Sequence, residues 1–297
     1  SPAPTLAQRT AAATQVAGTD PDCTAVQPFY WSVGDATGPL AGATASSDGS
    51  GPGATTVMSI ASASKWVYGA YVAQVRAGVL TADDVRFLTF RSGYTDFDQC
   101  LSNQTVDECE AYETNGTYVA ANDGKFYYGG GHMEKHAADN GLGAMDDVQL
   151  GAAVDAALGT GFSYSQPQLA GGIYTDAAHY GDFLRRIVSG ELAIAGLLGA
   201  DAVCTNPSQC PTEAVYTPIA SEDDHYSIGH WVEDDPAAGD GAFSSPGKFG
   251  FYPWISHDKA WWGVVARVDV LGGMQQGVAS MLCGRRIRAA WVAGSAG

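Results

Sequence analysis

Apolar residues recur along the chain at two different spacings, and strand-like spacing is concentrated near its two ends. Residues 5–17 carry a helical pattern, and two strand-like runs follow at 29–33 and 40–45 around a turn at Gly34-Asp35. The last quarter returns to strands, which we place at 226–232, 249–255 and 260–268, before a final helix at about 273–293.

The middle of the chain is mainly helical. Residues 65–78 have apolar positions at helical spacing and a glycine stop at Gly78, and 131–157 and 176–200 are also mostly helical. We therefore expect a mixed α/β fold, in which an antiparallel sheet from the N- and C-terminal segments is flanked by helices and carries an inserted, mainly helical lobe. We treat 1–297 as a single domain, with the sheet lobe at about 1–58 and 215–297 and the helical lobe at about 59–214.

Composition narrows the class of protein. With 297 residues and 45% apolar content, the chain can bury a large core. A net charge of −17 argues against nucleic acid or an anionic membrane surface as a partner, and indicates a solvated acidic surface. The longest uncharged apolar stretch, around 192–200, is too short to span a bilayer. The oligomeric state is left open.

The six cysteines predict disulfides. Cys100 and Cys109, and likewise Cys204 and Cys210, bracket short polar segments, while the remaining Cys23 and Cys283 would tie the two ends together. An even count in local pairs suits an oxidising compartment, and C-x-x-C, typical of structural zinc sites, is absent. The chain starts without a charged-then-apolar leader, so we expect a processed form that is secreted to an extracellular or periplasmic location.

The first candidate chemistry is Ser62-Ala63-Ser64-Lys65. A serine three residues before a lysine on a helix places both side chains on one face. A serine hydroxyl needs an adjacent base to act as a nucleophile, and a lysine can serve if burial or a second cation lowers its pKa.

Two later stretches supply partners for this pair. In Phe126-Tyr127-Tyr128-Gly129-Gly130, a tyrosine near a lysine ammonium would have its phenolate favoured, so Tyr128 could take a proton from the serine. In the stretch from Phe243 to Gly250, glycine lets a backbone N–H approach a ligand closely, as an oxyanion hole requires. Taken singly, each stretch fits a structural turn or bulge better than a functional site.

Together these stretches resemble the serine β-lactamase-like hydrolases, which include class C β-lactamases, DD-peptidases and related esterases. Further segments are similar to family motifs and occur in the family order across roughly residues 55–270: Leu88-Thr89-Phe90-Arg91-Ser92-Gly93-Tyr94, Pro167-Gln168-Leu169-Ala170-Gly171-Gly172, Tyr226-Ser227-Ile228-Gly229-His230-Trp231 and Ser245-Pro246-Gly247.

The resemblance implies roles at matching positions. Ser62 would be the acylated nucleophile, Lys65 its proton acceptor, and Tyr128 the second general base and acid. The backbone N–H groups of Ser62 and Lys248 would hold the oxyanion. We expect no cofactor and no metal.

Departures from the family pattern bear on the substrate. Gly130 replaces the Asn of Y-x-N, which would hold an acyl-amide group, and Ser245 replaces a His or Lys that would meet a substrate carboxylate. A second register, Lys248-Phe249-Gly250, would restore that cation; we prefer Ser245-Pro246-Gly247 because it leaves room before the strand. We take Ser245, Gly247, Gly130 and Trp254 as candidate substrate-binding residues, although Trp254 is equally compatible with strand core packing.

Other candidate sites are weaker. His132 and His136 have a spacing that zinc uses, but the glutamate between them is misplaced, and we expect a solvated helix face. Asp223-Asp224 and Asp234-Asp235 read as loop acids without the spacing of an EF-hand.

We therefore expect a secreted serine hydrolase that acts through an acyl-enzyme on Ser62, as a carboxylesterase for small-molecule or polymer esters. The alternatives are a β-lactamase or D-amino-acid peptidase, and a catalytically silent relative that binds ligands.

Overall fold

The structure, a computed structural model, describes residues 2–297, and the chain divides into two compact units. Unit 1 contains the chain up to Ile60, Thr175–Ser189 and Pro246–Gly297, and unit 2 contains Ala61–Tyr174 and Gly190–Ser245.

Unit 1 is built on an antiparallel sheet from both ends of the chain. Its strands follow the order β2 (Gly38–Ala45), β1 (Phe29–Asp35), β13 (Trp262–Ala266) and β12 (Tyr252–Ile255). The register pairs Trp31 with Ala43 on one side and with Val265 on the other. The N- and C-terminal segments thus share one sheet, as the sequence predicts.

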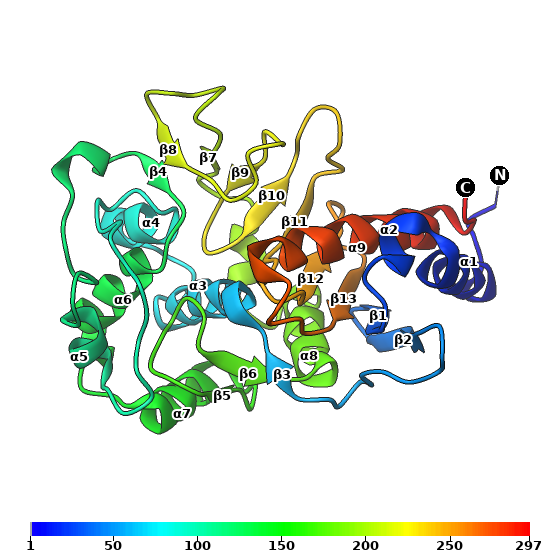
Figure 1. The fold of residues 1–297 in the computed structure, drawn as a ribbon, viewed down its shortest axis with the longest axis horizontal. Helices are drawn as coiled ribbons and strands as arrows, with labels where there is room; N and C mark the ends of the chain where they lie inside the picture. The colour runs from blue at the N-terminus through cyan, green and yellow to red at the C-terminus, as the bar shows by residue number, and fades with distance from the viewer. Residues whose placement is uncertain (1) are drawn as a thin grey trace. The chain divides into compact units, whose positions relative to one another are not determined.

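Helices cover both faces of the unit 1 sheet. Gly181 of α8 (Ala177–Val188) lies against Trp262, whereas Gly284 of α9 (Gln276–Ala293) lies against Tyr252 and Val265. Because successive strand residues point to opposite faces, α8 and α9 cover opposite sides. Helix α1 (Leu6–Thr19) packs along α9, and α2 (Pro21–Thr24) is tied to α9 by the Cys23–Cys283 disulfide (Figure 1). Strand β3 (Met58–Ser59) and the 3₁₀ turn η5 (Gly273–Gln275) complete the unit.

Unit 2 is mainly helical. A 3₁₀ turn η1 (Ala61–Ala63) leads into the buried helix α3 (Ser64–Val75), which packs against α7 (Asp147–Leu158) and η4 (Ala193–Leu197). The remaining helical segments are α4 (Ala82–Leu88), α5 (Val106–Glu110), η2 (Ala120–Asn122), α6 (Gly131–Ala137) and η3 (Ala138–Leu142).

Short strands complete unit 2. An antiparallel set runs in the order β7 (Val203–Cys204), β9 (His225–Tyr226), β10 (Trp231–Glu233) and β11 (Ala242–Ser244). Strand β4 (Phe126–Tyr127) pairs in parallel with β8 (Ala214–Tyr216), and β5 (Ser163–Tyr164) pairs antiparallel with β6 (Ile173–Thr175).

The predicted mixed α/β fold is confirmed. The predicted single strand at 226–232 is wrong, because Gly229 adopts a φ of 68° and turns the chain between β9 and β10. A side chain at Gly229 would lie 2.5 Å from the Lys65 carbonyl oxygen, so only glycine fits here. The strands in 203–244 pair with one another, and they belong to unit 2 rather than to unit 1.

The structure contains three disulfides with the pairs named from the sequence: Cys23–Cys283, Cys100–Cys109 and Cys204–Cys210. Within residues 2–297, no helix combines the length and apolar character needed to cross a membrane.

Candidate active site

The Ser62 hydroxyl and the Lys65 amine form the centre of the candidate site in unit 2. Lys65 Nζ lies 2.8 Å from Ser62 Oγ, within hydrogen-bonding distance. Ser62 sits in η1 and is partly exposed, whereas Lys65 in the first turn of α3 is only 5% exposed. The serine is thus the accessible member of the pair, and the lysine supports it from inside.

Backbone strain marks the residue before the serine. Ala61 has a φ of 45°, in the left-handed region that residues other than glycine rarely adopt. Such strain persists where the surrounding structure fixes it, and it is frequent at active sites. It presents Ser62 on a sharp turn ahead of α3.

The Lys65 amine is held by a second oxygen from a distant loop. Lys65 Nζ donates to the Ala170 carbonyl oxygen at 2.9 Å, and its Nζ lies 4.9 Å from the centroid of the Tyr128 ring. The three side chains that the sequence predicts to cooperate therefore lie together in unit 2.

Tyr128 follows β4 and packs in an aromatic cluster. Its ring contacts Phe90, Tyr226 and Trp231, with centroids 5.6, 6.0 and 5.5 Å away. Burial raises the pKa of Tyr128 to about 12, although hydrogen bonding with the Ser62 and Trp231 side chains acts in the opposite direction. The expectation of a favoured phenolate is wrong, because burial sets the net direction of the shift in the Tyr128 pKa. Tyr128 is a neutral phenol at neutral pH.

Two positions where the sequence departs from the family pattern have structural reasons. A side chain at Gly130 would lie 2.9 Å from the Phe97 ring, so an asparagine does not fit there without a shift of that ring. Ser245 is 2% exposed and its Oγ donates to the Ser62 carbonyl oxygen at 2.8 Å. Ser245 thus supports the nucleophile's backbone.

Three other predicted site residues belong to unit 1. A side chain at Gly247 would lie 2.1 Å from the Ile60 carbonyl oxygen, which requires glycine. Lys248 Nζ lies 4.9 Å from the centroid of the Phe249 ring. Trp254 is 1% exposed beneath Arg288 of α9, so its ring is part of the core, which does not fit a direct substrate contact. The oxyanion role of Lys248 stays a prediction.

The expectation of a solvated helix face at His132 and His136 is wrong, since both are buried in α6. His132 Nε2 donates to the Tyr127 carbonyl oxygen at 2.8 Å, while Nδ1 lies 2.6 Å from Ser92 Oγ. Burial lowers the pKa of His132 to about 4, so it is neutral and fixes the backbone next to Tyr128. No alternation of polar and apolar residues in the sequence signals this burial.

His136 belongs to a separate buried network. Its Nδ1 lies 2.6 Å from Tyr68 Oη and its Nε2 lies 2.7 Å from Asp84 Oδ1. Arg76 completes the network with a 2.9 Å ion pair to Asp84. Both ring nitrogens of His136 are therefore engaged by protein groups.

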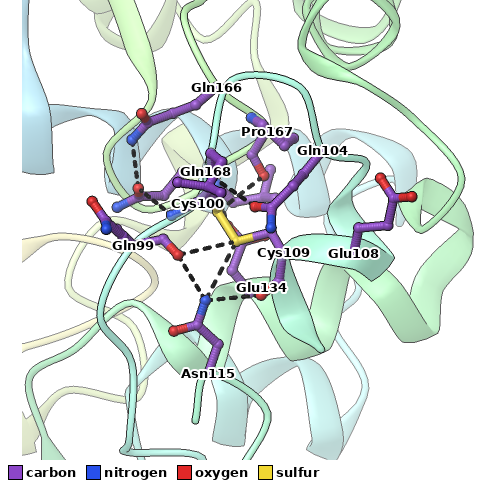
Figure 2. The surroundings of a disulfide bond; sticks show 12 residues. Gln99, Cys100, Gln104, Glu108, Cys109, Asn115, Glu134, Gln166, Pro167 and Gln168 are labelled. Atoms are coloured by element: carbon purple, nitrogen blue, oxygen red, sulfur yellow. Dashed lines mark hydrogen bonds between the residues drawn. A yellow bond between two sulfur atoms is a disulfide. The ribbon is translucent and has the colours of Figure 1, made fainter. Parts of the chain in front are cut away.

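The remaining acidic and metal candidates are also structural. Asp235 Oδ1 accepts the N–H groups of Ala237 and Ala238, and Asp224 Oδ1 accepts the N–H of Asp235, so these carboxylates shape the loop around β10. Within residues 2–297, one set of side chains, Cys100, Cys109 and Glu134, has the spacing to hold a metal, and its cysteines form a disulfide (Figure 2).

Comparisons with known proteins show where this fold recurs. No protein-family model matches the chain, and no curated protein sequence matches it. Among solved structures, a candidate β-lactamase from Bacteroides dorei is 21% identical, with a TM-score of 0.67 over 90% of this chain and 95% of that one.

Two further solved structures resemble the chain over nearly its full length. EstCE1, described as a hydrolase with promiscuous acyltransferase activity, is 14% identical, with a TM-score of 0.66 over 97% of this chain and 98% of that one. A D-stereospecific amidohydrolase from Streptomyces is 13% identical, with a TM-score of 0.58 over 95% and 99%. The chain therefore has the fold shared by serine β-lactamases, penicillin-binding proteins and the esterases and amidohydrolases that resemble them.

Proposed function

We propose that the protein is a serine hydrolase that forms an acyl-enzyme on Ser62 and cleaves carboxylic esters. The observation that supports it most is the 2.8 Å contact between Ser62 Oγ and Lys65 Nζ, with Tyr128 packed against the same amine. A partly exposed hydroxyl with a buried amine beside it meets the geometric requirement for an activated nucleophile.

The proposed reaction uses the three side chains in turn. The unprotonated Lys65 amine accepts the Ser62 proton as Oγ attacks the ester carbonyl carbon and the carbonyl electron pair moves to oxygen. When the carbonyl re-forms, the bond to the alkoxide breaks, and Tyr128, a neutral phenol, gives this leaving group its proton and recovers one from Lys65. Water repeats the sequence to release the acid and regenerate Ser62. The Ser62 N–H would hold the oxyanion, with Lys248 as the predicted second donor.

The surroundings of the serine favour esters over β-lactams and peptides. Residue 130 is glycine, so the side-chain amide that would hold an acyl-amide group is missing. The Phe97 ring occupies the space that an asparagine side chain would need at this position. The Ser245 hydroxyl is engaged by the Ser62 carbonyl and carries no positive charge for a substrate carboxylate. A neutral acyl group, in a small molecule or a polymer, needs neither anchor.

Export is part of the proposal. Three disulfides support an oxidising compartment, because such bonds are rare in the reducing cytosol of mesophiles.

A direct comparison of substrates tests the proposed function. Wild-type protein should hydrolyse a chromogenic short-chain ester with a kcat/KM at least about 100-fold above that for a chromogenic cephalosporin. Ser62→Ala should remove the ester activity while its melting temperature stays close to wild type. Faster cephalosporin hydrolysis would contradict the esterase proposal, and ester hydrolysis by Ser62→Ala would contradict the nucleophile.

A further inference from the structure

Glu134 is a buried acidic residue that the proposed chemistry does not use. Its side chain, in α6, is fully buried, and its Oε1 accepts the backbone N–H of Leu169 at 2.5 Å. Its Oε2 has no hydrogen-bond partner among the described residues. A buried carboxyl is costly, so its position calls for a specific reason.

The residue after Leu169 is the one that holds the lysine. Ala170 accepts a hydrogen bond from Lys65 Nζ at 2.9 Å through its carbonyl oxygen. Leu169 and Ala170 occupy the middle of a tight turn, which the N–H groups of Gly171 and Gly172 close onto the Gln168 carbonyl oxygen. The direction of the Ala170 carbonyl therefore depends on how this turn is anchored.

The Cys100–Cys109 disulfide lies next to the same turn. Cys100 N–H donates to Gln168 Oε1 at 3.5 Å, and Cys100 Sγ lies 3.7 Å from the Pro167 carbonyl oxygen (Figure 2). A carboxyl oxygen of Glu134 lies within 4.8 Å of both sulfur atoms. Glu134 and the disulfide thus both lie beside residues 167–169, immediately before Ala170, and the short hydrogen bond among these contacts is the one from Leu169 N–H to Glu134.

We propose that Glu134 is a positioning residue for the nucleophile: by accepting the Leu169 N–H, it fixes the Ala170 carbonyl that holds the Lys65 amine beside Ser62. This inference rests on the proposed acyl-enzyme at Ser62. Glu134 does not touch substrate in this account, and it acts only through the turn.

The charge state of Glu134 suits this role. Burial raises the pKa of Glu134 well above its usual range, against the lowering effect of the hydrogen bond from Leu169 N–H, and the nearby Glu110 carboxylate adds to the rise. Tyr68 and Tyr164 are close enough to interact electrostatically with Glu134, and burial raises the pKa of both phenols. A neutral carboxyl leaves no unpaired negative charge in the core and still offers the carbonyl-type oxygen that Leu169 N–H needs. Glutamine offers the same acceptor without an ionisable proton.

The test measures the rate at which a fluorophosphonate labels Ser62, between about pH 5 and 10, in four variants of the full chain. Glu134→Gln keeps the acceptor and should label within about threefold of wild type. Glu134→Leu removes it and should label about 10- to 100-fold more slowly, as expected when a catalytic group is misplaced by about 1 Å. Glu134→Asp, whose carboxyl is too short to reach Leu169 in the same geometry, should fall between them.

Asn115→Ala is the matched control. Asn115 is fully buried and donates to the carbonyl oxygens of Gln99 and Cys109, so it supports the same disulfide loop without contacting residues 167–170. Its substitution should lower the melting temperature but leave the labelling rate within about threefold.

The pH dependence of the labelling rate adds a readout that a general loss of stability does not change. The Ala170 carbonyl stabilises the protonated Lys65 amine more than the neutral one, so losing this contact should lower the pKa of Lys65. The acid limb of the labelling-rate profile should therefore shift to lower pH in Glu134→Leu and in no other variant.

The outcomes separate this inference from the proposed function. Wild-type protein that takes no label at Ser62 would contradict the acyl-enzyme itself and the role of Glu134 with it. If wild-type protein is labelled normally, and Glu134→Leu has the same labelling rate and the same acid limb as wild type, the role of Glu134 is overturned while the proposed function stands. A loss in Asn115→Ala or Glu134→Gln as large as that in Glu134→Leu would overturn that role too. If Glu134→Leu does not fold, Glu134→Asp decides the question by the same criteria.

Discussion

Lys65 Nζ lies over the face of the Tyr128 ring, 4.9 Å from its centroid. The N–H groups of an amine over an aromatic face interact with the ring's π electrons whether or not the amine is protonated, and this contact does not require an ionised hydroxyl. The geometry agrees with a phenol whose pKa is raised to about 12 by burial. In the proposed mechanism, Tyr128 is therefore the proton donor and relay, and the unprotonated Lys65 amine is the first base.

Tyr128→Phe tests this division of roles. The ring and its packing on Phe90 and Trp231 stay, so the melting temperature should change little. Loss of the hydroxyl should lower kcat by about 10²- to 10⁴-fold, the usual contribution of a general acid. Steady-state ester hydrolysis measures it, with Tyr127→Phe as the control. Near-normal turnover in Tyr128→Phe would mean that another group protonates the leaving alkoxide.

The steric conflict between residue 130 and Phe97 predicts a coupled pair of substitutions. Gly130→Asn should destabilise the protein by about 1–3 kcal/mol, because its Cβ would lie 2.9 Å from the Phe97 ring. Gly130→Asn combined with Phe97→Ala should lose less stability than the sum of the two single substitutions. A double-mutant cycle by urea unfolding measures the coupling, and strict additivity would show that the two side chains do not compete for this space.

His132 predicts a loss of stability in acid. Its folded-state pKa, lowered to about 4 by burial, is below the unfolded value of about 6.5. The unfolded chain therefore binds more protons between about pH 6.5 and 4, and this contribution to stability is lost as the pH falls through that window. The stability gap between wild type and His132→Asn should shrink over the same range. A gap that is constant with pH would show that His132 titrates normally.

Glu134 predicts the opposite trend with pH. Its raised pKa means that the folded protein keeps a proton that the unfolded chain releases above about pH 4.3, so its contribution to stability falls as the pH rises. Glu134→Gln has no such proton. Urea unfolding should therefore show that the free energy of unfolding of Glu134→Gln, relative to that of wild type, increases from pH 4 to pH 7. A gain that does not grow with pH would indicate an ionised Glu134 in the folded state.

The Cys23–Cys283 bond predicts a large stability effect within unit 1. It closes a separation of 260 residues, so replacing both cysteines by alanine should cost about 3–5 kcal/mol, mainly by freeing the unfolded chain. The same change at Cys204–Cys210, with a separation of 6, should cost about 2 kcal/mol. Equal effects measured by chemical unfolding would show that loop entropy does not govern these bonds.

Local patterns predicted much of the fold because the relevant forces are local. The hairpin of β1 and β2, helix α3 and helix α9 follow from residue spacing and turn chemistry over a few residues. The pattern of residues 226–232 does not indicate the break at Gly229, since Gly229 is required by the close approach of the Lys65 carbonyl from helix α3.

The environment of the candidate site was harder to predict than its members. Ser62, Lys65 and Tyr128 lie together in the structure, but the raised pKa of Tyr128 comes from its burial among rings of distant segments, including Phe90 and Tyr226. Likewise, nothing in the sequence around Glu134 indicates that it meets the Leu169 N–H, 35 residues away. Burial of this kind is set by tertiary packing.

The most direct test of the account is the intact mass of the protein, quenched in acid during hydrolysis of a p-nitrophenyl ester and followed by peptide mapping. The account predicts a single added acyl group on the peptide that contains Ser62, and no added mass in Ser62→Ala. Turnover without any adduct on that peptide, or an adduct that persists in Ser62→Ala, would contradict it.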